Sequence, residues 1–157
     1  MDMPSKSFVT SYEKISNVLI NEVHISKVFD DPPINFNHLE DPNCKKYKAI
    51  WDTGGNITVI NKKVIEDCDL IPIGRTIMRS PGGENRSYLY LINLWLKNGL
   101  MIPNLRVVEG VLTEDVEVLI GMDIINLGDF AVSNKDGKTV FTFRYPSYEK
   151  IDFVYKS

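Results

Sequence analysis

The sequence has few of the residues on which common metal and thiol sites depend. Its 157 residues include only two cysteines and two histidines. Cys44 and Cys68 lack the CxxC spacing of a zinc or redox site, and we expect two free thiols. His24 and His38 belong to no HExxH pattern, which excludes a zinc protease of that kind. We expect no metal and no cofactor.

Long apolar runs and concentrations of one charge are also missing. No apolar run approaches the roughly 18 residues of a membrane helix, and residues 1–10 hold no signal-peptide core. The net charge is −3, and the basic residues are spread without a basic stripe, which argues against nucleic acid. Neither GxxxxGK[ST] nor GxGxxG occurs, so nucleotide binding of those types is excluded. We expect a cytoplasmic protein without membrane contact.

Short strand patterns separated by turn signals dominate what is present. The length fits one domain spanning residues 1–157, and 43% apolar residues suffice for a packed core. Short helices are expected at residues 61–67, with Asn61 as the N-cap, and at residues 123–127. The pattern predicts an all-β domain, closed as a barrel or sandwich. The expected strands are residues 18–28 (one strand or a hairpin), 47–51, 57–60, 75–79, 87–96, 105–108, 116–120, 130–133 and 139–143.

Two segments do not fit the strand pattern. Residues 30–46 carry Pro and Asp/Asn clusters and predict an irregular loop insertion. It either decorates the surface, which we expect, or caps a cleft, or serves as a cleavable or inhibitory segment. The tail, residues 145–157, is rich in Tyr, Phe, Val and Ile, and is a candidate for one further strand.

The sharpest local feature is a run of apolar residues that leads directly into Asp52-Thr53-Gly54-Gly55. A carboxylate at the end of such a strand is anchored beside the core. The two glycines let backbone N–H groups approach and orient it. The ordinary alternative is an Asx-type turn between two strands, and Asp-Thr-Gly by itself does not exclude it.

A second motif, apolar residues followed by Gly121-Met122-Asp123, lies well downstream. Together, the two motifs resemble the retropepsin-like aspartic protease family. That family has Asp-Thr/Ser-Gly, then a flap hairpin, then an apolar-apolar-Gly strand leading to a helix. Here the hairpin corresponds to the segment around Pro81-Gly82-Gly83, and the last strand to Leu119-Ile120-Gly121. The resemblance covers about residues 18–143.

The resemblance implies an aspartic endopeptidase that works as a homodimer, because the chain has one Asp-Thr-Gly where pepsin-like enzymes have two. Asp52 would meet its own copy across a two-fold axis, with Thr53 and Gly54 completing the catalytic motif. A water activated between the two carboxylates would attack an extended peptide or protein substrate. Leu119, Ile120 and Gly121 would support the catalytic loop from beneath. The tail would lie in or near the dimer interface.

Substrate contacts are expected from Gly55, Gly82, Gly83 and Tyr88, with the flap closing over the peptide. Tyr88 packing on the sheet is an equally good interpretation. The family usually has Ala or Ser where Gly55 stands, and a Ser hydroxyl would favour the ionised carboxylate. We therefore expect a less acid-shifted activity profile than in a Ser-bearing relative.

Two neighbouring side chains are assigned to structure and not to catalysis. Strand alternation puts Trp51 on the face opposite Asp52, in the core. Asp123 stands at a helix start, where it would cap N–H groups. Two other functions stay open at this point: a non-catalytic retropepsin-fold module that dimerises for binding or assembly, and an unrelated β-barrel binding protein with chance motifs.

Overall fold

The computed structural model describes residues 5–30, 36–113 and 115–154. It is mainly β, with two short α-helices, as the sequence predicts. The elements are β1 (Lys6–Ser11), β2 (Ile20–Lys27), β3 (Lys45–Trp51), β4 (Val59–Ile60), α1 (Lys62–Asp67), β5 (Gly74–Ser80), β6 (Gly83–Trp95), β7 (Met101–Glu109), β8 (Val118–Ile120), α2 (Met122–Ile125), β9 (Asp129–Ser133), η1 (Lys135–Gly137) and β10 (Val140–Tyr145). No helix in these residues is long and apolar enough to cross a membrane.

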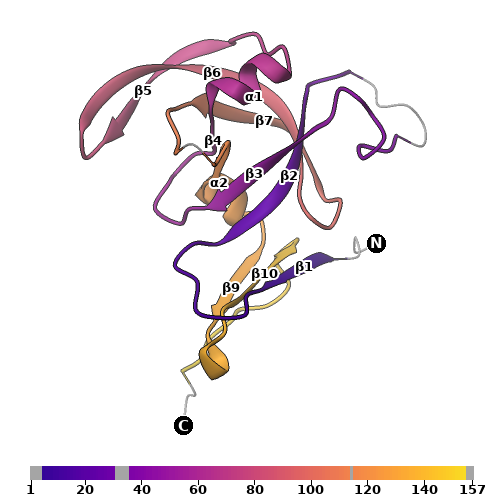
Figure 1. Cartoon of the computed structure of the whole chain (residues 1–157), viewed down its shortest axis with the longest axis vertical. Helices are drawn as coiled ribbons and strands as arrows, with labels where there is room; N and C mark the ends of the chain where they lie inside the picture. The colour runs from indigo at the N-terminus through magenta and orange to yellow at the C-terminus, as the bar shows by residue number, and fades with distance from the viewer. Residues whose placement is uncertain (1–4, 31–35, 114, 155–157) are drawn as a thin grey trace.

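Six strands close into a barrel (Figure 1). The sheet runs β2-β3-β8-β4-β7-β6-β5, and β2 also pairs with β6, which joins the two ends of the ring. β5 stays outside the ring, because its recorded pairing is with β6 alone. Alternate side chains of the ring strands fill the interior. Fully buried examples are Val23, Ile25, Ala49, Ile60, Ile92, Leu94, Val107, Val118 and Ile120.

A second, three-stranded sheet lies below the barrel in Figure 1, with β10 between β1 and β9. An aromatic cluster joins the two sheets. Trp51, at the end of β3, lies 5.2–5.8 Å by ring centroid from Phe8, Phe130 and Phe143. The Trp51 indole N–H donates to Asn21 Oδ1 at 2.9 Å, so its one polar atom is satisfied. Trp51 is a core residue, as alternation predicts.

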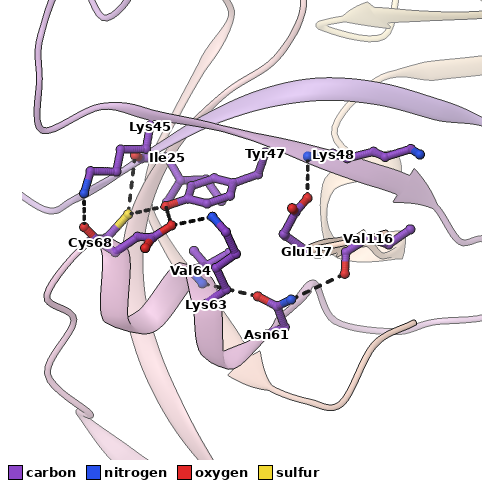
Figure 2. A network of polar contacts seen from close by, with 11 residues as sticks. Ile25, Lys45, Tyr47, Lys48, Asn61, Lys63, Val64, Cys68, Val116 and Glu117 are labelled. Atoms are coloured by element: carbon purple, nitrogen blue, oxygen red, sulfur yellow. Dashed lines mark hydrogen bonds and ion pairs between the residues drawn. The ribbon is translucent and has the colours of Figure 1, made fainter. Parts of the chain in front are cut away.

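The helix α1 follows β4 directly and is fastened to the barrel at both ends (Figure 2). Asn61 is its N-cap, as predicted, and accepts the Val64 N–H at 3.2 Å. At the other end, the Tyr47 hydroxyl donates to Asp67 Oδ2 at 3.3 Å and contacts Cys68 Sγ at 3.3 Å. Burial raises the pKa of both Tyr47 and Cys68, so neither ionises at neutral pH.

The described part of the insertion, residues 36–44, packs on one end of the barrel. Phe36 and His38 lie over Trp95, with the His38 ring parallel to the indole at 5.3 Å. Cys44 closes the segment as a free thiol whose pKa burial raises to about 12. Residues 31–35 of the predicted insertion lie outside the described residues.

The described part of the tail, residues 146–154, forms no strand, so the candidate strand predicted there is absent from it. Asp129 holds the start of this segment. Its carboxylate accepts from Arg144 Nη2 at 2.6 Å and from the Tyr148 N–H at 2.8 Å. The hydrogen bond from the Ser147 hydroxyl, followed by those from Tyr148 and Arg144, holds the pKa of Asp129 well below its usual range. Residues 155–157 of the tail lie outside the described residues.

Candidate active site

The turn that carries Asp52 directly follows Trp51, the last residue of β3. The Asp52 N–H donates to the Ile120 carbonyl of β8 at 2.8 Å, which fixes the residue against the neighbouring strand. Within the turn, Asp52 Oδ1 accepts the Gly54 N–H at 3.0 Å, and the Asp52 carbonyl accepts the Gly55 N–H at 3.2 Å. The carboxylate is therefore oriented by one backbone N–H, that of Gly54, and stays partly open to solvent.

The glycines of the turn leave room for that carboxylate. A Cβ on Gly54 would lie 3.3 Å from Asp52 Oδ1, and one on Gly55 would lie 3.2 Å from Oδ2. Both distances are tighter than ordinary contact, so side chains at either position would press on the acid. Thr53, between Asp52 and Gly54, is exposed.

β8 lies against the turn, and Gly121 follows it directly. It pairs in parallel with β3, with Ile120 opposite Trp51. The backbone then approaches so closely that a Cβ on Gly121 would lie 2.7 Å from the Ile57 carbonyl carbon and 3.0 Å from the Gly55 oxygen. The Met122 N–H donates to the Gly55 carbonyl at 2.7 Å. Only glycine fits at position 121 without displacing the turn.

Thr58, which follows the turn, is hydrogen-bonded to Asp123 in a pair that we call the clamp. The sequence did not predict this pair. Asp123 Oδ2 accepts the Thr58 N–H at 2.9 Å, and Oδ1 accepts the Thr58 hydroxyl at 2.8 Å. The hydroxyl oxygen also accepts the Gly121 N–H at 3.2 Å. Asp123 does accept one helical N–H, that of Ile124, but the N-cap position of α2 is Gly121. The role of Asp123 is structural, and its main partner lies 65 residues away.

A cleft of about 440 Å³ separates the Asp52 turn from β5. Asp52, Gly54 and Gly55 lie on one side, and residues 76–79 of β5 lie on the other. Its apolar floor is formed by Ile57, Val59, Leu89, Val108 and Leu119. Because β5 is an edge strand, its outer backbone groups are available to an extended chain entering beside it. No described residue of the insertion lines this cleft.

The other predicted substrate contacts lie further out. Gly82 and Gly83 form the tip of the β5–β6 hairpin and do not line the cleft. Gly83 has φ +119°, a conformation that glycine adopts readily. Tyr88 is paired with Arg75 in register, and the Arg75 guanidinium lies 5.2 Å from its ring. It is 40% exposed on the face away from Leu89, so the structure does not bring it to Asp52.

Among the described residues, no group of three or more His, Cys, Asp or Glu side chains is placed to hold a metal ion. The site therefore presents a carboxylate, oriented by the Gly54 backbone N–H, at the edge of a cleft beside an unpaired strand edge.

Comparison with solved structures identifies the fold. No family model and no curated protein sequence matches the chain. Among solved structures, a retropepsin-like aspartic protease from Rickettsia conorii is similar over 92% of this chain and 98% of its own, with a TM-score of 0.55 and 10% identity. The EIAV protease bound to an inhibitor is similar over 73% of this chain and 90% of its own, with a TM-score of 0.50 and 14% identity.

The chain therefore has a retropepsin-like fold, as the sequence motifs predict. Both of these structural neighbours are proteases, and the Rickettsia protein is described as an aspartic one.

Proposed function

We propose that the protein is a homodimeric aspartic endopeptidase, with one site built from the Asp52 carboxylates of two chains. The observation that carries this proposal is the position of Asp52. Its carboxylate is oriented by the Gly54 N–H at 3.0 Å and lines a cleft on a retropepsin-like fold. A turn with no chemical role has no need to present its acid to a cleft in this way.

Two carboxylates at one site supply both an acid and a base. Like charges close together resist double ionisation, so the pair holds one proton over a wide pH range. The ionised Asp52 takes a proton from a bound water, which attacks the peptide carbonyl carbon. The protonated Asp52 gives its proton to the carbonyl oxygen, which forms a tetrahedral diol. Collapse of the diol breaks the C–N bond, and the proton returned to the amine completes hydrolysis without an acyl-enzyme.

The second carboxylate has to come from another chain. The sequence contains one Asp-Thr-Gly, and Asp123 is held in the clamp with Thr58. An isologous dimer brings a residue beside its own copy, and exposed Thr53 beside Asp52 is available for contact across the axis. The tail is assigned to the neighbourhood of that interface, and the whole chain to one domain.

The β5–β6 hairpin supplies the flap in this proposal. A peptide in extended conformation adds beside the outer edge of β5, as extended ligands do at exposed sheet edges. Gly82 and Gly83 let the tip approach the substrate backbone, and Gly55 borders the substrate opposite. Tyr88 is not assigned a place in the cleft. A cytoplasmic location stays a prediction from the sequence.

The competing function is a retropepsin-fold dimer that binds without cleaving. Nothing in the turn geometry favours it, because the Asp-Thr-Gly turn is intact and its carboxylate lines the cleft. The retropepsin-like fold also sets aside the interpretation of an unrelated barrel with chance motifs.

The test is digestion of a complex peptide library by wild type and Asp52→Asn, at mildly acidic and neutral pH. Cleavage that vanishes in the variant supports the proposal and reports the specificity. If neither protein cuts while both are dimers by light scattering, the result favours the binding module over the endopeptidase. Equal cutting by both proteins places the chemistry elsewhere, or in a contaminant.

A further inference from the structure

A second hollow of about 910 Å³ adjoins the cleft on the β6 side of the hairpin. The two share the side chains of Val59, Met78 and Leu119, so the hollow begins where the apolar floor of the cleft ends. Its other walls are residues 85–88 of β6, the segment 109–112 and the start of α1. A substrate side chain that extends from the cleft past Val59 and Leu119 would enter the hollow.

The hollow combines apolar and charged side chains. Its apolar part is formed by Val59, Met78, Val111, Leu112 and Leu119. Its charged side chains are Lys62, Lys63, Arg86 and Glu109. This composition suits a side chain with an apolar stem and a charged end.

The charges of the hollow leave one cation without a partner. Lys63 lies 2.6 Å from Asp67, and Lys62 lies 3.4 Å from Glu66, both within α1. The Arg86 guanidinium has no ion pair or hydrogen bond to any residue that the structure describes. Its register neighbour across the hairpin is the apolar Ile77, which offers it no charge.

Among the residues that line the hollow, one is an acid. Glu109 Oε2 accepts the hydroxyl of buried Tyr90 at 3.4 Å. The other two arginines of the hairpin are also occupied. Arg79 pairs with Glu84 at 2.8 Å, and Arg75 lies over Tyr88. The chain as a whole has a net charge of −3, yet this hairpin carries three arginines and one glutamate.

We propose that the hollow is a charge-selective subsite that takes an acidic side chain of the substrate, with Arg86 as the selecting residue. This inference rests on the proposed endopeptidase function. Arg86 supplies a planar donor fork that matches a carboxylate, and Lys62 adds positive charge from the opposite wall. Lys62 is 79% exposed in its pair with Glu66, and such pairs are weak enough to rearrange. A two-fold dimer has two such hollows, one on each side of the scissile bond.

The experiment compares matched peptides that carry Glu, Gln or Lys at each position around a cleaved bond. We expect wild type to cleave the Glu peptide with a kcat/KM about threefold to tenfold higher than that of the Gln peptide. The preference should appear at one position on each side of the cleaved bond, and it should weaken in high salt. Arg86→Gln removes the preference, and Arg86→Glu turns it toward Lys. Arg75→Gln is the control, because Arg75 lines neither the cleft nor the hollow and its guanidinium lies over the Tyr88 ring. A merely structural role of Arg86 would not reverse the preference.

A binding arm keeps the inference testable without turnover. Fluorescence polarisation measures the affinity of labelled Glu and Gln peptides for Asp52→Asn. Cleavage by wild type with no preference between Glu and Gln overturns the inference and leaves the proposed function intact. A Glu preference in binding, lost in Asp52→Asn/Arg86→Gln, with no cleavage by wild type supports the subsite and contradicts the endopeptidase. Equal affinity for both peptides overturns the subsite.

Discussion

The two sides of the cleft are held in place in different ways. The Asp52 turn is fixed from β8 and α2 by backbone hydrogen bonds of 2.7–2.8 Å, and by the clamp of Thr58 and Asp123. The outer half of the β5–β6 hairpin pairs only with itself among the described residues, apart from the Ser87 hydroxyl, which donates to the Glu109 carbonyl. Most of its side chains are exposed.

In the proposed endopeptidase, this difference separates the positioning of the carboxylate from the closure of the flap. A catalytic carboxylate has to be held to within a fraction of an ångström, and the turn has contacts of that quality. A flap has to move on each turnover, and a two-stranded hairpin with few packed side chains opens at low cost. Changes beneath the turn should therefore reduce both folding stability and activity, and changes in the hairpin should reduce mainly activity.

The largest effect is expected from Gly121→Ala. The added Cβ would meet the Ile57 carbonyl at less than 3 Å, so the turn or β8 has to shift. We expect a loss of about 1–3 kcal/mol in the free energy of unfolding, as for overpacked cores. The displaced carboxylate should lower kcat by about 100-fold. Urea unfolding and peptide cleavage measure the two effects, and an active variant of wild-type stability would contradict the support role of Gly121.

Thr58→Val tests the clamp with a side chain of nearly equal size. It removes the donor to Asp123 Oδ1 and the acceptor of the Gly121 N–H, both at a fully buried position. We expect a loss of about 1–3 kcal/mol in unfolding free energy and a fall in kcat. Thr139→Val is the matched control, because Thr139 is also buried and its hydroxyl both donates, to Asn134 Oδ1, and accepts, from the Ser16 N–H, away from the cleft. The control should lose stability but no activity, and an equal fall of kcat in both variants would argue against a special role for the clamp.

Gly83→Ala tests the hairpin tip. An alanine at φ +119° is strained, and we expect a loss of about 1 kcal/mol or a local change of the turn. Because the tip packs on nothing, kcat/KM should fall while the thermal midpoint changes by only a few degrees. Gly137→Ala is the control, because Gly137 also has a positive φ of +71° and open surroundings but lies in η1, away from the cleft, so this variant should cut peptides as wild type does. A fall in stability without loss of activity would show that this tip does not close on substrate.

Gly55→Ser is expected to have the smallest effect. Its Cβ would lie 3.2 Å from Asp52 Oδ2, so the hydroxyl can donate to the carboxylate. A hydrogen bond to the ionised form favours that form, and the acid limb of the pH–rate curve should move to lower pH. Gly55→Ala separates this effect from crowding. An unchanged curve in Gly55→Ser would contradict the expectation.

Local features of this molecule could be read from the sequence. The N-cap Asn61, the hairpin turn before Gly83 and the position of Trp51 depend on residues within a few positions of each other. The order of Asp-Thr-Gly, hairpin and apolar-apolar-Gly was enough to predict the retropepsin-like fold. Expected strands also had roughly correct positions, with β7 longer and β8 shorter than predicted.

Features that depend on distant partners were missed. β1 has a mostly polar sequence with one buried side chain, Phe8, and its partner β10 lies more than 120 residues away. The clamp of Thr58 and Asp123 spans 65 residues. Tyr88 lies in a correctly predicted strand, but a change of one residue in phase decides which face a side chain occupies. Only the register with β5 and β7 fixes that phase.

A subunit-mixing experiment tests the central claim most directly. Wild type is equilibrated with increasing amounts of Asp52→Asn, and cleavage is measured per wild-type chain at a fixed total concentration. If each site needs Asp52 from two chains, that activity falls in proportion to the wild-type fraction, because mixed dimers are inactive. Activity per wild-type chain that does not change with added variant would show that one chain acts alone, and would contradict the shared site.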